Sequence, residues 1–232
     1  MNNGTYMFIQ RAFVLFGDFQ QYADVSNASR IQEMFGRDYI MGQQPLPAFG
    51  PNGPLFALTL SKAVVKWTIQ PSRIDFLTTA ESAEAALLEF LSIAPKFRIK
   101  GTRASVLTTI AVVDPDKRRM KIAAEKIGGV FGQNDSPITQ FNLRFNRVKP
   151  LKIGEKANCN VSIGDGVVQG INKVGVPTAN SAIIIQTDIN TLTENNAPRF
   201  EEADTLGTVY RELLRTDETV ISEALELLSE RV

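Results

Sequence analysis

The chain of 232 residues has no histidine and only one cysteine, Cys159. Without histidine, the sequence excludes Ser-His-Asp and Cys-His nucleophilic mechanisms, histidine-ligated metal sites and the usual switch near neutral pH. A lone cysteine forms neither an internal disulfide nor a structural zinc site, which fits a reducing compartment. The chemistry that remains belongs to carboxylates, lysine, tyrosine, serine and threonine, or to an oxygen-ligated Mg²⁺ or Ca²⁺.

Net charge and long apolar runs are missing as well. Lys plus Arg equals Asp plus Glu at 25 each, so the whole molecule has no electrostatic attraction to nucleic acid or anionic lipid. No run approaches the roughly eighteen apolar residues of a membrane span, and the opening "MNNGTYMFIQ" lacks a basic n-region. We therefore expect a soluble, cytoplasmic, globular protein without a membrane partner.

The first half of the chain alternates short strand patterns with helix patterns. A helix is expected over 26–36, with Ser26 as N-cap, and another over 80–93, opened by a Thr78–Glu81 capping box. The proline- and glycine-rich stretch 41–54 is typical of a loop. Apolar alternation predicts strands at 5–17, 55–60, 63–70, 73–79 and 105–113.

The second half repeats this rhythm loosely. We expect a helix over about 117–127, a strand over 139–148, and three more strands in 157–176 and 180–190, with Gly164-Asp165-Gly166 as a hairpin turn. A long C-terminal helix has an apolar seam from Leu206 to Leu228, interrupted near Asp217.

Strands in blocks with helices between them predict an α+β fold. The sheet is expected to be mostly antiparallel and in two blocks, with the long amphipathic helix at the C-terminus. Two halves, 1–114 and 115–232, form either two units or one continuous domain. The pattern leaves open whether the halves arose by duplication.

The glycine-rich stretch "EKIGGVFGQNDSP" (125–137) could hold a phosphate or end a helix. A phosphate loop needs a strand, then glycines, then a helix N-terminus. Here the helical pattern comes first, which favours Gly128 and Gly129 as the C-cap, with Lys126 in the last turn.

The candidate interaction site is the basic run Lys117, Arg118, Arg119 and Lys121. Such a run is either a solvated helix face or a contact for an acidic partner or nucleic acid. Asp114 and Asp116 precede it and could cap the helix or bind a hard cation.

The remaining chemically notable residues are expected to be structural. Asp188 either pairs with a cation or faces solvent, Cys159 packs in the core, and Trp67 anchors the core because it alternates in phase with Val65 and Ile69. No catalytic, cofactor-binding or metal-binding residue is predicted.

Three features in order carry a family resemblance: Trp67 in a strand, the segment "IDFLTT" (74–79), and Asp188-Ile189 before the last helix. On these the chain resembles a sporadically distributed family of uncharacterised bacterial α+β proteins of about this size. The resemblance implies a fold and no mechanism. It implies an accessory role, for example in a defence or mobile-element operon.

Four functional hypotheses follow. The first is a non-enzymatic binding or regulatory protein that acts through protein–protein contacts and forms a homo-oligomer. The second is a small-ligand module with a pocket between the sheet and the C-terminal helix, lined by Trp67 and phenylalanines. The third is a nucleic-acid partner through residues 117–121, and the fourth is a carboxylate–metal enzyme.

Overall fold

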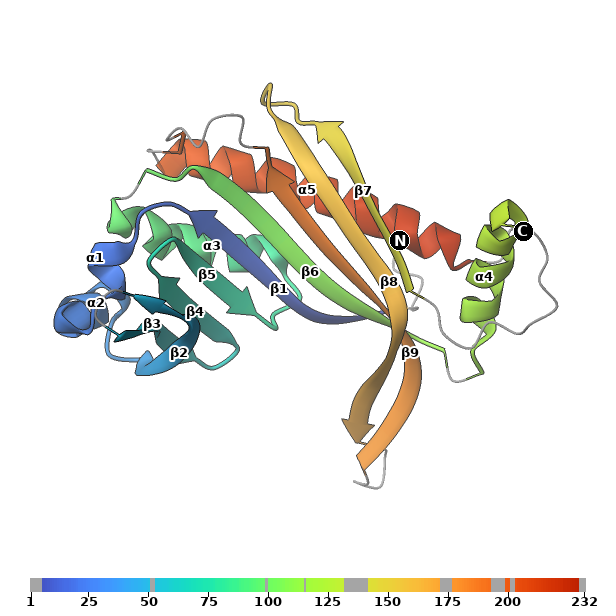
Figure 1. The fold of residues 1–232 in the computed structure, drawn as a ribbon, viewed down its shortest axis with the longest axis horizontal. Coiled ribbons are helices and arrows are strands. Elements are labelled where there is room, and N and C mark those ends of the chain that lie inside the picture. The colour runs from blue at the N-terminus through green and yellow to red at the C-terminus, as the bar shows by residue number, and fades with distance from the viewer. Residues whose placement is uncertain are drawn as a thin grey trace.

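The computed structural model describes residues 6–50, 53–98, 100–114, 116–131, 142–171, 177–192, 199–200 and 203–229. Within these residues one antiparallel sheet has the strand order β2-β3-β4-β5-β1-β6-β9-β8-β7 (Figure 1). The strands are β1 (Met7–Phe16), β2 (Ile40–Gly50), β3 (Gly53–Lys62), β4 (Val65–Gln70), β5 (Arg73–Thr78), β6 (Arg103–Val113), β7 (Asn142–Pro150), β8 (Lys156–Ile171) and β9 (Pro177–Thr191). The helices are α1 (Gln20–Ala23), α2 (Ala28–Phe35), α3 (Ala83–Ile93), α4 (Arg118–Phe131) and α5 (Ala203–Leu227).

The expected α+β class, antiparallel sheet and C-terminal helix are confirmed, but the two blocks are one sheet. Strand β6 pairs with β1 on one side and with β9 on the other, from Ser105 opposite Asn190 to Val113 opposite Ala182. Pairing on both edges of a long strand satisfies its backbone groups, so the strands of the two halves join in the middle of the sheet.

The two halves have the same order of elements. In the first, β1 is followed by α1, α2, a strand meander and α3; in the second, β6 is followed by α4, a meander with one strand fewer, and α5. In each half the last strand of the meander pairs with the first strand, and Phe13 lies opposite Val106 where the halves meet. This repetition is what a duplication would produce. The division at residue 114 itself stays a prediction.

One face of the sheet is apolar and lies under α3 and α5 (Figure 1). Alternation along β4 buries Val65, Trp67 and Ile69 on this face, as predicted. The Trp67 ring stacks on Phe90 of α3 at 5.6 Å, and Phe90 contacts Tyr210 of α5 at 4.8 Å. Trp67 is therefore a core anchor, as expected.

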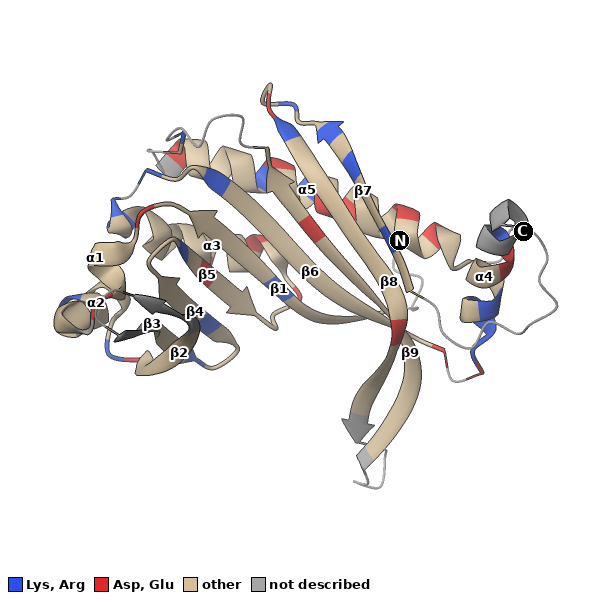
Figure 2. Ribbon diagram, viewed as in Figure 1, with Lys and Arg blue, Asp and Glu red and all other residues tan. Residues whose placement is uncertain are grey.

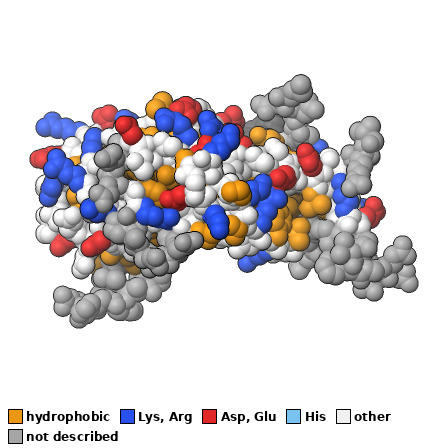
Figure 3. All heavy atoms as spheres, turned by 90° about the horizontal axis from the view of Figure 1, so that it is seen from above, with side chains coloured by type: hydrophobic (Ala, Val, Ile, Leu, Met, Phe, Trp, Pro, Cys, Tyr) orange, Lys and Arg blue, Asp and Glu red, His pale blue; other side chains and the backbone are white. Residues whose placement is uncertain are grey.

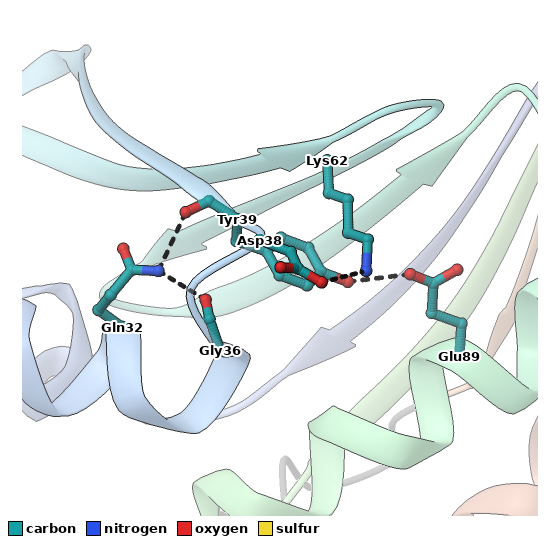
Figure 4. Close-up of polar contacts among 6 residues, drawn as sticks. All are labelled: Gln32, Gly36, Asp38, Tyr39, Lys62 and Glu89. Carbon is teal, nitrogen blue, oxygen red and sulfur yellow. Dashed lines mark hydrogen bonds and ion pairs between the residues drawn. The ribbon is translucent and has the colours of Figure 1, made fainter.

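The predicted end of the first helix at Gly36 is confirmed. Gly36 has φ +91°, and the Gln32 side chain donates to the carbonyls of Gly36 and Tyr39 at 2.7 and 3.0 Å (Figure 4). The Tyr39 hydroxyl then donates to Glu89 on α3 at 2.9 Å. Burial first, and then the Glu89 carboxylate, raises the pKa of Tyr39 to about 12. These contacts hold the turn before β2 against α3.

Two expected helix starts and one expected loop are wrong. Asn27, not Ser26, precedes α2, and it makes no side-chain cap hydrogen bond. Helix α3 is capped by Ser82, whose Oγ accepts from the Ala85 amide at 3.2 Å. The stretch 41–54 lies largely in β2 and the start of β3. Strand β2 lies at the edge of the sheet, where proline is tolerated, and its register with β3 shifts between Pro45 and Phe49.

The expected hairpin turn at Gly164-Asp165-Gly166 is also wrong. Strand β8 runs through all three residues, and its ladder with β9 continues to Ile171 opposite Pro177. Two strands therefore stand where three were expected. A Cβ on Gly166 would lie 2.3 Å from Ile184 Cγ1, so close packing explains this glycine.

Candidate functional site

A hollow of about 1300 Å³, named here the α4–α5 groove, lies on the helix-covered side of the sheet. It extends between the N-terminal end of β1, the middle of β6, the start of α4 and the second half of α5. The residues that line it include Tyr6, Phe8, Arg11, Glu81, Thr108, Ile110, Asp114, Asp116, Arg118, Arg119, Ile122, Glu218, Ile221, Ser222, Leu225 and Glu226.

At the start of α4, only two of the four residues of the predicted basic run line the groove. Asp114 caps this helix, since its Oδ2 accepts from the Met120 amide at 3.0 Å. Arg118 and the half-buried Arg119 line the groove. Lys117 and Lys121 are exposed and do not line it. Two of the four predicted interaction residues thus lie in one wall of the groove.

The opposite wall of the groove is acidic. Glu218 and Glu226 on α5 line it, and Glu81 lies at the approach to α3. Figure 2 shows basic residues on the first turn of α4 and acidic residues along the C-terminal half of α5. The α5 wall is therefore acidic, whereas the α4 wall carries Arg118 and Arg119 together with the carboxylates of Asp114 and Asp116.

A β-bulge shapes the apolar floor. Phe8 pairs with Ile110 and Gln10 pairs with Thr109, so the register shifts at Ile9. This extra residue reverses the alternation, which places Phe8 on the same face of the sheet as Arg11 and Phe13. The floor consists of Phe8 and Ile110 from the sheet, with Ile122, Ile221 and Leu225 from α4 and α5.

A buried polar cluster lies beside this floor. Asp217, which interrupts the apolar seam of α5, is fully buried and accepts from Thr108 Oγ1 at 2.6 Å and from the Thr187 hydroxyl. Arg11 Nε donates to Thr108 Oγ1 at 3.2 Å. Burial raises the pKa of Asp217, against the opposing effect of the two threonine hydrogen bonds.

Arg11 was not recognised as a site residue from the sequence. Its signal was present, because Arg11 has the same strand parity as Phe13 and Leu15 and is therefore a charged residue on the inward face of β1. The sequence showed that the apolar seam is interrupted near Asp217, but it did not indicate the hydrogen-bond partners of this residue. The partners come from strands β6 and β9, far from Asp217 in the sequence.

The expected helix end at Gly128 and Gly129 is wrong. Helix α4 continues through both residues to Phe131, since glycine in a helix costs only about 1 kcal/mol. Gly132 and the rest of "GQNDSP" lie outside the described residues. Lys126 does not cap its own helix; its ammonium donates to carbonyls at the end of α5.

The other predicted residues lie outside the groove, apart from Asp116. Asp188 is on the opposite, uncovered face of the sheet, in a hollow of about 920 Å³, and accepts from Ser105 at 2.6 Å and from Asn190 at 3.2 Å. Cys159 is buried, which confirms its packing role. Over the described ranges, no three His, Cys, Asp or Glu side chains gather closely enough to hold a metal ion.

Surface charge is interspersed by sign on the face seen in Figure 3, where basic and acidic side chains alternate with apolar ones. None of the helices in the described part of the chain is both long and apolar enough to cross a membrane. No known protein-family model matches the chain, and none of the curated proteins compared with it is similar in sequence.

Proposed function

We propose that this is a non-enzymatic binding protein that acts through protein–protein contacts and holds a polypeptide segment in the α4–α5 groove. The observation that supports this most directly is the combination of walls. Arg118 and Arg119 line one side of the groove together with Asp114 and Asp116, and Glu218 and Glu226 line the other. The floor between the two sides is apolar. A polypeptide presents both charge signs and apolar side chains together, which matches such a groove.

The alternatives match the groove less well. Small-molecule pockets usually measure about 300–1000 Å³, and this groove measures about 1300 Å³. Trp67, expected to line a ligand cavity, is packed in the core. A nucleic acid attracted by the basic residues would also meet the acidic wall of α5, which repels phosphates.

The family resemblance extends the proposal to a cytoplasmic accessory role in bacteria. A second copy of the chain is one form that the polypeptide partner can take, which would make the protein a homo-oligomer.

Site-specific photo-crosslinking in cells of the native host tests the proposal. A benzoylphenylalanine replaces Ile122 in the groove, and the control places it at Val148, which is exposed on β7. We expect one defined polypeptide adduct from position 122, weakened by Arg118→Glu with Arg119→Glu, and none from position 148. Equal adducts at both positions, or adducts only with nucleic acid, would overturn the proposal.

A further inference from the structure

Arg11 places a hydrogen-bond donor without an acceptor at the floor of the α4–α5 groove. The residue lines the groove but is only 6% exposed. Its Nε donates to Thr108, whereas Nη1 is buried and has no hydrogen-bond partner. The Phe8 ring lies over the guanidinium, 5.1 Å from its carbon to the ring centroid. A buried, unsatisfied donor on a charged group is costly, so an acceptor at this place has a large effect.

The nearest acidic groups do not supply that acceptor. Asp217 is reached only through Thr108, whose hydroxyl donates to Oδ2, while the Thr187 hydroxyl occupies Oδ1. Across the described residues, Arg11 forms no ion pair with a carboxylate. Burial lowers the pKa of Arg11, and the charges of Asp217 and Glu218 oppose that shift without contacting Nη1. The guanidinium is therefore a largely desolvated cation in the lining of the groove, with one buried nitrogen that has no acceptor.

We infer that Arg11 binds a carboxylate carried by the occupant of the groove. The inference rests on the proposed function, and it specifies the segment as acidic at the position that reaches the floor. A guanidinium donates two parallel hydrogen bonds to a carboxylate as a fork, and Nη1 and Nη2 are the two nitrogens not engaged by Thr108. A main-chain carbonyl offers no compensating charge, so a side-chain or C-terminal carboxylate is the better match.

The test uses the full chain labelled with ¹⁵N-arginine. Acetate and N-acetylglutamate are titrated at constant ionic strength, with chloride as the control anion, and the Arg11 side-chain NH resonances are followed. We expect a saturable shift of the Arg11 resonances and a rise in melting temperature with the carboxylates only. Arg11→Lys keeps the charge and loses the fork, so affinity should fall about tenfold or more. Arg144→Gln, which removes an exposed arginine from the uncovered face, should change nothing.

The spectra of the wild-type protein test carboxylate binding by Arg11 even if the Arg11→Lys variant does not fold. Shifts confined to Arg118 and Arg119, or equal shifts with chloride, would show that Arg11 does not bind carboxylates. If position 122 crosslinks a partner and Arg11→Lys leaves that adduct unchanged, the carboxylate site is wrong and the proposed function stands. If acetate shifts Arg11 and no polypeptide crosslinks, the carboxylate site stands and the proposed function fails.

Discussion

The Lys126 ammonium on α4 donates a hydrogen bond to the Ser229 carbonyl, just beyond the end of α5, at 2.5 Å. It also donates to the carbonyls of Leu227 and Glu226, at 3.1 and 3.3 Å. These carbonyls lie at and just beyond the end of α5, where the last helical carbonyls lack their usual i+4 partners, and a cation there opposes the negative end of the helix dipole. Lys126 thereby links α4 to the end of α5, where Glu226 and Ser229 line the α4–α5 groove.

Replacing Lys126 by Met should lower the free energy of unfolding by about 0.3–1 kcal/mol, because the end of α5 loses its cap and its cation. Amide exchange in residues 222–229 should accelerate. Lys121→Met, on the exposed side of the same helix, is the matched control and should leave both measurements unchanged. Equal urea denaturation curves for both variants would contradict the capping role.

Asp217→Asn should alter how stability depends on pH. Burial raises the pKa of Asp217 above its ordinary value of 3.8, so ionisation of this carboxyl opposes folding. Below pH 3.8 it is protonated in both states and imposes no penalty. As pH rises through the folded-state pKa, the wild type should lose stability relative to the Asn variant. Urea unfolding between about pH 4 and 8 measures the difference, and parallel profiles would contradict it.

Gly166→Ala should destabilise the fold by about 1–3 kcal/mol, because the new Cβ would lie 2.3 Å from Ile184 Cγ1 on β9. Adding Ile184→Ala removes the obstructing atoms and should recover much of the loss. Thermal or urea unfolding of the single and double variants measures this coupling. Wild-type stability of Gly166→Ala would show that β8 and β9 are not packed this closely.

Only Arg118 and Arg119 of the basic run line the groove, so we expect them to affect binding differently from Lys117 and Lys121. Arg118→Ala with Arg119→Ala should change stability by no more than about 0.5 kcal/mol, while partner affinity falls and its salt dependence becomes shallower. Lys117→Ala with Lys121→Ala should weaken binding much less, because neither residue lines the groove. Fluorescence anisotropy with the crosslinked partner's segment, at several salt concentrations, compares the pairs. Identical losses for both pairs would indicate diffuse charge attraction.

Strands were predictable where one face is buried and the pattern alternates. The residues of β4 and β5 show this, as does the apolar seam of α5. Strand β2 was missed because proline signals a loop locally, and only its place at the sheet edge makes proline acceptable. The continuous β8 was missed because Gly166 is required by Ile184, which comes from another strand.

The candidate site was predictable in part. The basic run was found from charge alone, but the sequence did not indicate that only Arg118 and Arg119 line a groove. Arg11 was unrecognised because its importance depends on Thr108 and on the groove beside it. These neighbours lie on other strands and helices, and the pattern of residues along the sequence does not specify which of these elements pack together.

By itself, the sequence determined the chemistry that is excluded, the α+β class and the inward faces of most elements, because composition and periodicity are local properties. Only the tertiary structure decided that the two strand blocks form one sheet, that the glycines at 128 and 129 continue α4, and that Lys126 caps α5. It also decided that Asp217 and Arg11 share Thr108. Each of these depends on burial and close approach between segments far apart in the chain, where desolvation and packing outweigh local preference.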